Sequence, residues 1–254
     1  MRIVTGFHPI EEELKAFSEN SESVKESGIR ILYTKTGPRI KKILALAESL
    51  SIPCEKSSEE VLGNYVATLP EAARDHRGLL LLTEKTNSLK VHSIEAVLEK
   101  LEKKNNALVL VLDSITDMQN IGAIIRSAEQ FGVDLVVIPD HHGAADMDLI
   151  SRMSAGAAAW IPVVAVPNLV RAVELLKKAG FWVYGADSNG TPAPELKITG
   201  KTTLIMGNEG KGISRLLLET CDVVVSIPTR GHLDSLNVSV ATGILLYEIR
   251  RSSK

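Results

Sequence analysis

The stretch Ala107–Pro139 reads ALVLVLDSITDMQNIGAIIRSAEQFGVDLVVIP and contains one complete strand–helix–strand pattern. The apolar runs Leu108–Leu112 and Leu135–Pro139 predict strands, and Asn120–Phe131 between them has apolar residues at helical spacing. Both strand runs are continuously apolar rather than alternating, which is typical of strands that are covered on both faces. The stretch therefore predicts a parallel sheet with helices on both sides, the arrangement of the α/β class.

The same alternation continues to the C-terminus. Further strands are predicted at 162–166, 181–185, 203–206 and 223–227, and helices at 147–158, 169–179, 213–219 and 238–250. Residues 1–83 mix shorter apolar runs with helical patches, and the charged stretch 84–106 carries one amphipathic helix. The sequence thus predicts a small first α/β domain over 1–83, a linker over 84–106 and a larger domain over 107–254.

Composition limits the class of protein. Hydrophobic residues make up 44% and charged residues 24% of the 254 residues, which excludes a disordered or fibrous chain. No apolar run approaches the ~18 residues of a membrane span, and the N-terminus lacks the apolar core of a signal peptide. Two cysteines, Cys54 and Cys221, make neither a disulfide framework nor a zinc cluster, so we expect a cytoplasmic protein with reduced thiols. The net charge of −2 excludes a basic nucleic-acid-binding tail but not a local basic patch.

Unusual sequence follows three of the predicted strands, and ligands of open α/β sheets bind at the carboxyl ends of strands. After the first strand, Asn120 is suited to cap the next helix, and Arg126 is predicted to point away from that helix's apolar stripe. An isolated arginine in such a place is most often a solvated surface residue. The sequence alone leaves both a solvated and a functional Arg126 open.

The other two strand ends are rich in glycine and in polar residues. Met206-Gly207-Asn208-Glu209-Gly210-Lys211-Gly212 has three glycines in six residues, which lets the backbone approach a ligand closely, although a tight turn would use glycine equally. It is neither a Walker loop nor a dinucleotide fingerprint. The segment from Ile227 to Ala241 contains Ser235 and Asn237, one of which is expected to cap the last helix.

These segments, in this order and spacing, resemble the three motifs of the SpoU branch of SPOUT methyltransferases, at Asn120–Arg126, Gly207–Gly212 and Ile227–Ser239. The first domain, with Thr5-Gly6-Phe7-His8-Pro9-Ile10 near its start, resembles the substrate-binding domain of the ribosomal guanosine members. The resemblance implies a trefoil-knotted parallel-sheet methyltransferase domain over 107–254, preceded by an RNA substrate-binding domain over 1–83.

The implied activity is transfer of a methyl group from S-adenosylmethionine to the ribose 2′-hydroxyl of a guanosine in 23S ribosomal RNA. The enzyme would work without a metal and as a homodimer that partly buries Leu245, Leu246 and Ile249 of the last helix. The resemblance assigns catalytic roles to Asn120, Arg126, Glu209, Ser235 and Asn237. It assigns cofactor contacts to Met206, Gly207, Gly210, Gly212, Ile227 and Leu236.

Several alternatives stay open at this stage. Arg126 is either a base or an electrostatic anchor. The high pKa of arginine makes it a poor base unless a neighbouring RNA phosphate and a tuned site assist it, whereas an anchor needs neither. It serves either its own subunit's site or the partner's. The substrate could be transfer RNA, although the separate first domain favours ribosomal RNA. A catalytically inactive RNA-binding module is opposed by the complete set of motif residues. The first domain's basic residues are either a solvated helix face or phosphate contacts: Arg30, Lys35, Arg39, Lys41 and Lys42.

Overall fold

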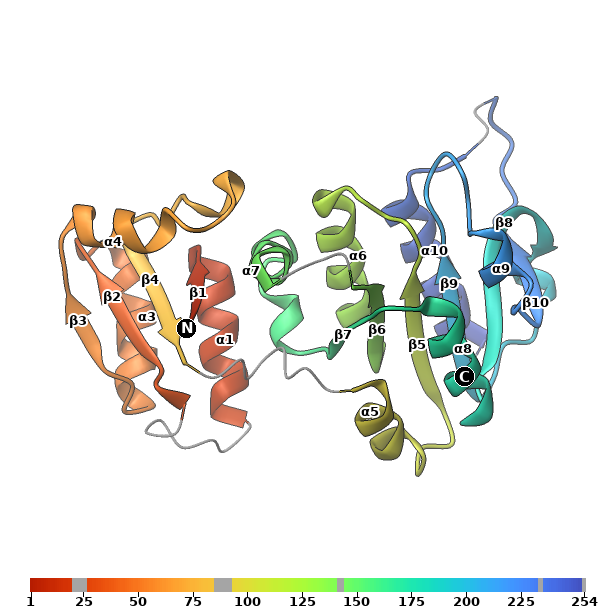
Figure 1. The fold of residues 1–254 in the computed structure, drawn as a ribbon, viewed down its shortest axis with the longest axis horizontal. Coiled ribbons are helices and arrows are strands. Elements are labelled where there is room, and N and C mark those ends of the chain that lie inside the picture. The colour runs from red at the N-terminus through yellow and green to blue at the C-terminus, as the bar shows by residue number, and fades with distance from the viewer. Residues whose placement is uncertain (20–26, 85–92, 141–143, 233–234, 253–254) are drawn as a thin grey trace. The chain divides into compact units, whose positions relative to one another are not determined.

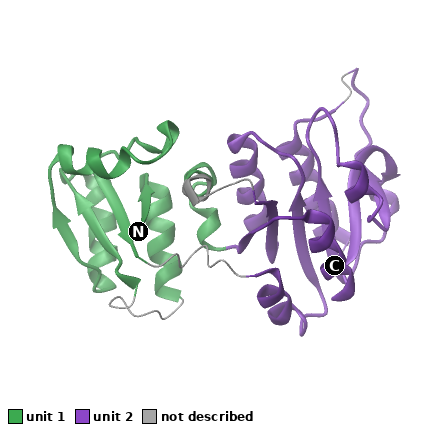
Figure 2. Cartoon of the chain, viewed as in Figure 1, with its two compact units in different colours: residues 1–90, 143–160 green, residues 91–142, 161–254 purple. Residues whose placement is uncertain are grey.

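The computed structural model describes residues 1–19, 27–84, 93–140, 144–232 and 235–252 (Figure 1). The chain forms two compact units (Figure 2). Unit 1 consists of residues 1–90 and 143–160, and unit 2 of residues 91–142 and 161–254. Unit 1 is therefore built from two separate pieces of the sequence.

Unit 1 has a four-stranded sheet, and the more apolar of its two inner strands is β4 (Leu79–Thr83). The spatial order is β1 (Arg2–Thr5), β4 (Leu79–Thr83), β2 (Arg30–Tyr33), β3 (Cys54–Lys56). Only β2 and β3 are parallel; β4 is antiparallel to both of its neighbours. One face of the sheet packs against α1 (Phe7–Glu19) and α3 (Pro38–Ser49), which bury Ile10, Leu14 and Ile43. The described residues of the first piece also form the short helices α4 (Glu59–Val66) and η1 (Glu71–Ala73).

The second piece of unit 1 holds α7 (Ala144–Met153) and η2 (Ala157–Ala159). Trp160 Nε1 donates to Glu12 Oε2 of α1 at 2.9 Å, and Arg152 Nη1 donates to Thr5 Oγ1 at 3.1 Å. The backbone at Gly156 has a φ of +91°, and a Cβ there would lie 2.8 Å from the Cβ of Glu12. The helix predicted over 147–158 is broken at this point.

The sequence-based division at 84–106 stays a prediction, and residues 85–92 of that linker lie outside the described residues. By sequence, the piece 143–160 falls inside the predicted methyltransferase segment. In the structure it groups with the first 90 residues, because its contacts are with α1, β1 and η1.

Unit 2 is a six-stranded sheet in which every pairing is parallel. The order is β10 (Val223–Ser226), β8 (Trp182–Pro192), β9 (Lys201–Met206), β5 (Ala107–Leu112), β6 (Leu135–Pro139), β7 (Val163–Val166). The predicted α/β class with a parallel sheet is confirmed. Among the described residues, no helix is long and apolar enough to cross a membrane.

Helices cover both faces of this sheet, as the continuous apolar strands predict (Figure 1). Residues such as Val109, Val111 and Ile205 pack against α5 (Ile94–Leu101), α8 (Leu169–Lys178) and α9 (Arg215–Leu218). On the other face α6 (Met118–Gln130) packs against α10 (Val238–Ser252). The turn η3 (Ala193–Glu195) links β8 to β9.

Two local features differ from the sequence-based expectation. Asp117, not Asn120, caps α6, because Asp117 Oδ1 accepts from Gln119 N at 2.8 Å and the helix begins at Met118. In addition, β8 extends to Pro192, well beyond the predicted end at residue 185. Its partners on β10 jump from Gly185↔Val224 to Thr191↔Val225, so residues 186–190 form a bulge.

Candidate active site

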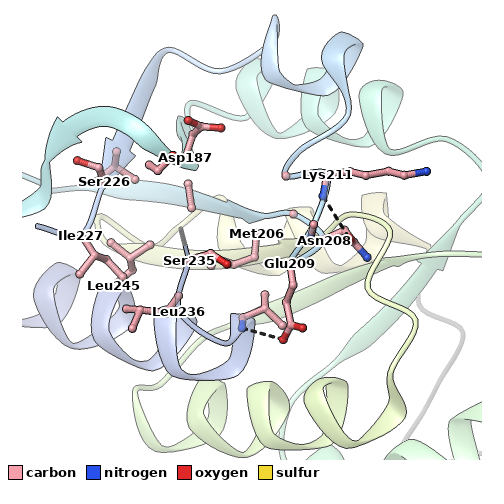
Figure 3. Close-up of a pocket in the computed structure, with 18 of the residues that line it drawn as sticks. Asp187, Met206, Asn208, Glu209, Lys211, Ser226, Ile227, Ser235, Leu236 and Leu245 are labelled. Carbon is pink, nitrogen blue, oxygen red and sulfur yellow. Dashed lines mark hydrogen bonds between the residues drawn. The ribbon is translucent and has the colours of Figure 1, made fainter. Parts of the chain in front are cut away.

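A pocket of about 380 Å³ lies among the carboxyl ends of β9 and β10, the bulge of β8 and one face of α10 (Figure 3). This is the edge at which parallel α/β sheets bind ligands. The pocket is lined by 186–188, 206–212, 225–227, Thr229, Ser235, Leu236, Val238, Ala241 and Leu245.

The loop after β9 closes on itself through its own backbone. Asn208 N donates to Gly212 O at 3.0 Å, and Gly212 N donates back to Asn208 O at 2.8 Å. A Cβ at Gly207 would lie 2.2 Å from the carbonyl carbon of Gly212, a distance that no side chain tolerates. Glycine is therefore required at position 207 by the fold of the loop itself. The glycine pattern predicted close approach of a ligand at this position, and the loop's own backbone supplies a second reason for glycine.

A buried carboxylate holds this loop in place from the neighbouring strand. Asp113 follows β5 directly and is only 5% exposed. Its Oδ2 accepts from Ser214 N at 2.6 Å, and its Oδ1 accepts from Ser114 Oγ at 3.0 Å. Asn208 Nδ2 donates to Ser114 O at 3.0 Å. The ends of β5 and β9 are thus joined by side-chain hydrogen bonds, which fixes the position of the loop.

Glu209 connects the loop to two helices. Its Oε1 accepts from Asn120 Nδ2 at 3.1 Å, from Asn237 Nδ2 at 2.7 Å and from Val238 N at 3.1 Å. Asn237 Nδ2 also lies 3.0 Å from Asn120 Oδ1. Figure 3 shows the Glu209 carboxylate at the N-terminus of α10. We call Asn120, Glu209 and Asn237 the amide–carboxylate cluster; it brings together side chains that lie 28 to 117 residues apart.

Asn237 has a second task at the start of α10. Its Oδ1 accepts from Ser239 N at 3.0 Å and from Val240 N at 3.3 Å, which is the geometry of a helix N-cap. Of the two candidate caps, Ser235 and Asn237, the second is the one that caps. Because Oδ1 binds the helix and Nδ2 binds Glu209, the Asn237 carboxamide has a single orientation.

Comparison with known proteins identifies the family. Residues 107–247, more than half of the chain, match the SpoU rRNA Methylase family. The chain belongs to this family. A Borreliella burgdorferi protein named as an uncharacterized tRNA/rRNA methyltransferase is 40% identical over 228 residues, 88% of this chain and 98% of the relative. The 23S rRNA (guanosine-2′-O-)-methyltransferase RlmB of Photobacterium profundum is 32% identical over 250 residues, 98% of this chain and 97% of the relative.

A solved structure agrees with the fold over the same length. The SpoU methyltransferase AviRb of Streptomyces viridochromogenes, crystallised in complex with the cofactor AdoMet, superimposes with a TM-score of 0.72 and 24% sequence identity. The match covers 98% of this chain and 89% of AviRb. The family resemblance is confirmed, and so is the inferred α/β fold class with a parallel sheet.

Most of the site residues predicted from the SpoU motifs line the pocket or bind a residue that lines it. All six positions predicted to contact the cofactor line it: Met206, Gly207, Gly210, Gly212, Ile227 and Leu236. Of the positions predicted to be catalytic, Glu209 and Ser235 line the pocket, and Asn120 and Asn237 bind Glu209. Their roles stay predictions. Residues 233–234 of the third SpoU motif lie outside the described residues.

Arg126 is the SpoU motif residue that stands apart. It is exposed on α6, does not line the pocket and forms no hydrogen bond or ion pair with the described part of the chain. Six residues separate it from Asn120, about 9 Å along the helix axis at 1.5 Å per residue. The structure therefore does not bring Arg126 into contact with this chain's own amide–carboxylate cluster.

Two carboxylates at the site were missed by the sequence analysis. Asp113 positions the glycine loop, and Asp187 lines the pocket from the bulge of β8. Each comes at or just beyond the end of a predicted strand, and that placement is the signal that could have indicated them. Neither residue belongs to the three SpoU segments, so the family resemblance does not indicate them.

Proposed function

We propose that this chain methylates the ribose 2′-hydroxyl of a guanosine in 23S ribosomal RNA, in the cytoplasm, with S-adenosylmethionine as cofactor. The carrying observation is the amide–carboxylate cluster, which unites all three SpoU motifs beside a pocket. The Photobacterium RlmB matches both units of this chain, which favours a ribosomal over a transfer RNA substrate. The intact cluster argues against an inactive RNA-binding module.

The pocket suits S-adenosylmethionine in size and in chemistry. Its volume of about 380 Å³ lies within the ~300–1,000 Å³ of small-molecule sites. Ile227, Leu236 and Leu245 give an apolar wall for an adenine ring, and the loop at Gly207 offers backbone amide and carbonyl groups. When bound, the cofactor supplies an electrophilic methyl group. We further infer that residues 107–254 carry the trefoil knot of the SpoU family.

The chain's own residues have to orient the ribose and stabilise charge. The Asn120 and Asn237 side chains are held by Glu209, so their positions are set before RNA arrives. Ser235 lies exposed on the pocket wall, within reach of an incoming ribose. In this proposal, the Arg126 guanidinium anchors an RNA phosphate and the developing charge on the 2′-oxygen.

We propose a homodimer formed through the surface shared by α6 and α10. On α10, Val240, Ile244 and Tyr247 are 51%, 41% and 57% exposed and share one face of the helix. α6 packs beside them, with Tyr247 edge-on to Phe131 at 6.4 Å between ring centroids. Exposed apolar side chains at this spacing suit a symmetric contact with a second copy.

The expected dimer residues of the last helix need a correction. Leu245, Leu246 and Ile249 are 2%, 0% and 3% exposed within the single chain, because they face its own sheet and pocket. They have no surface left for a partner. The apolar residues that α10 leaves exposed are Val240, Ile244 and Tyr247.

Light scattering tests the dimer. Ile244→Glu places a charge in the proposed interface and should yield monomers at micromolar concentration. Glu248→Gln on the same helix is the matched control and should leave the dimer intact. A wild-type monomer would contradict the proposal.

Arg126 is exposed on α6, one of the two helices of the proposed dimer surface, so we propose that it acts in the partner's site. Mixing inactive Arg126→Ala with inactive Asn237→Ala tests this directly. Heterodimers would then contain one site in which both residues are intact, and activity should recover to about a quarter of the wild-type level. This fraction assumes that subunits assort at random, leaving one intact site of two in half of the dimers. No recovery after verified subunit exchange would place Arg126 in its own subunit's site.

Unit 1 is proposed to bind RNA through exposed cations near the start of α3. Lys35, Arg39 and Lys41 are exposed, and Arg39 Nη2 lies 2.6 Å from His8 Nε2 on α1. Lys42, in contrast, is paired with Glu11 at 2.9 Å. The predicted basic stretch is therefore partly neutralised by α1. Charge removal at Lys35 and Lys41 should weaken RNA binding and reduce its salt dependence, whereas Lys42→Gln should change both less.

The decisive test of the activity is direct. Purified protein, S-adenosylmethionine and either a 23S RNA fragment or transfer RNA would be incubated, and ribose methylation located by mass spectrometry. Methylguanosine in the 23S fragment supports the proposal, and the same product in transfer RNA alone supports the alternative substrate. Comparing ribosomal RNA from cells with and without the gene identifies the nucleotide.

A further inference from the structure

One charged group in the pocket is not explained by the contacts described so far. Glu209 Oε1 already accepts three hydrogen bonds, and Asn208 Oδ1 accepts from Gly210 N and Lys211 N. Ser226 Oγ donates to Gly190 O at 2.8 Å. Within the described part of the chain, Glu209 Oε2 and Asp187 Oδ2 have no hydrogen-bond donor, and of these two residues Asp187 is the one outside the amide–carboxylate cluster.

The bulge of β8 holds Asp187 in a defined place. Its Oδ1 accepts from Asn189 N at 2.9 Å and from Asn189 Nδ2 at 3.2 Å, so one carboxylate oxygen is committed to the local turn. Its Oδ2 lies 3.7 Å from the position of a Cβ on Gly212, at the far end of the glycine loop. The side chain is half-buried. A carboxylate fixed in this way between two pocket walls costs desolvation energy unless a ligand donates to it.

The position of Asp187 within the pocket indicates which donor it meets. The bulge pairs with β10, and in Figure 3 Asp187 lies on the side of Ser226 and Ile227, whereas Asn208 and Lys211 lie on the other side. The wall near Ile227 is the one suited to adenine. A donor close to the adenine is a ribose hydroxyl, because the ribose is bonded to the base. The cofactor's ammonium is several bonds further away, and its carboxylate suits Lys211.

We infer that Asp187 accepts hydrogen bonds from the ribose hydroxyls of the cofactor's adenosyl group. An ionised carboxylate oxygen accepts such bonds strongly, and an acidic side chain near a strand end that binds a ribose hydroxyl is a recurrent solution in α/β folds. The residue would select for a ribonucleoside cofactor and set its depth in the pocket. The inference rests on the proposed cofactor site.

Calorimetry with S-adenosylhomocysteine and two of its analogues tests this assignment. Asp187→Asn keeps the oxygen that binds Asn189 and replaces the other with an amide group, which donates rather than accepts. We expect about a tenfold to hundredfold loss of affinity for S-adenosylhomocysteine. For the 2′,3′-dideoxy analogue, wild type and variant should bind equally, because the hydroxyls are gone. Glu195→Gln, an exposed carboxylate outside the pocket, is the control.

Each other outcome overturns the inference. Equal affinity of wild type and Asp187→Asn for S-adenosylhomocysteine would show that Asp187 makes no such bond. A loss that persists with the dideoxy analogue but vanishes with the deamino analogue would assign Asp187 to the ammonium. A loss with all three ligands would indicate a structural role, which thermal unfolding of the variant would reveal. Failure of the wild type to bind S-adenosylhomocysteine contradicts the proposed cofactor site instead.

Discussion

The amide–carboxylate cluster and Arg126 both depend on α6, yet they are built in opposite ways. Asn120, in the first turn, shares hydrogen bonds with Glu209 and Asn237. Arg126, six residues later, is exposed and forms no polar contact within the described part of the chain. One helix thus supplies a group that is fixed by its own chain and a group whose partner has to come from elsewhere.

The two groups differ in when their side-chain entropy is lost, either during folding or during binding. Side chains held by several hydrogen bonds lose their rotamer freedom when the protein folds, so binding RNA costs little further entropy. Arg126 keeps that freedom, and the entropy is lost only when a second subunit or an RNA phosphate arrives. Mutations in the cluster should therefore change both stability and activity, and mutations at Arg126 should change activity alone.

The largest effect is expected for Gly207→Val. The new Cβ would have to occupy the space of the Gly212 carbonyl carbon, 2.2 Å away, so the glycine loop cannot keep its conformation. Binding of S-adenosylhomocysteine, measured by calorimetry, should fall below detection and the thermal midpoint should drop. Unchanged affinity would mean that this loop does not form the cofactor site.

Arg126→Ala should lose at least ~100-fold in single-turnover methylation, or ~2.7 kcal/mol of transition-state stabilisation. Its free energy of unfolding should change by under ~0.5 kcal/mol, as for an ordinary exposed residue. Arg126→Lys should also be strongly impaired, because lysine keeps the charge without the planar fork. Full activity of the Ala variant would show that Arg126 is a surface residue without a catalytic role. A large loss of stability would show that Arg126 makes contacts within its own chain.

Glu209→Gln should have an intermediate effect on two measurements at once. The three donors that now meet a charged oxygen would meet a neutral amide, so we expect about 1–3 kcal/mol of destabilisation in denaturant unfolding. The methylation rate should fall about tenfold because Asn120 and Asn237 lose their common anchor. A variant with normal stability but no activity would instead indicate that Glu209 contacts the substrate directly.

The smallest effect is expected for Gly210→Ala. A Cβ at this position meets only Asn208 Oδ1, at 3.6 Å, which is an ordinary contact. Affinity for S-adenosylhomocysteine should stay within about twofold of wild type, as for a surface substitution worth under ~0.5 kcal/mol. The variant is the matched partner of Gly207→Val; a loss equal to that of Gly207→Val would show that the loop fails for reasons other than steric overlap.

The sequence predicted those parts of the structure that local patterns control. The strands around Val109 and Val137 are so uniformly apolar that only a sheet buried on both faces accommodates them. The joint role of Glu209 and Asn237, in contrast, was implied by the resemblance to the SpoU motifs and not by any local pattern. The prediction that Asn120 caps α6 was wrong because Asp117, which is an equally good cap, lies closer to the first backbone N–H groups of the helix and accepts from that of Gln119 instead.

What the sequence could not predict depends on contacts between distant segments. The bulge of β8 exists because β10 pairs onward with Thr191, and nothing within 186–190 signals that pairing. The same holds for Asp187, whose significance lies in its distance to Gly212 rather than in its neighbours along the chain. The buried side of α10 is likewise decided by the elements packed against it, so the dimer role that the family resemblance implied for Leu245 could not be checked against the sequence.

The two-piece construction of unit 1 has a consequence for synthesis on the ribosome. Arg152 and Trp160 bind Thr5 and Glu12, so the first domain to emerge cannot complete its packing until residue 160 has left the exit tunnel. By then β5, α6 and β6 have already been made, and the two units must fold over overlapping periods rather than one after the other. A fragment that stops at residue 90 would leave part of α1 uncovered. During translation, this first piece should therefore stay incompletely packed until residues 143–160 have been synthesised.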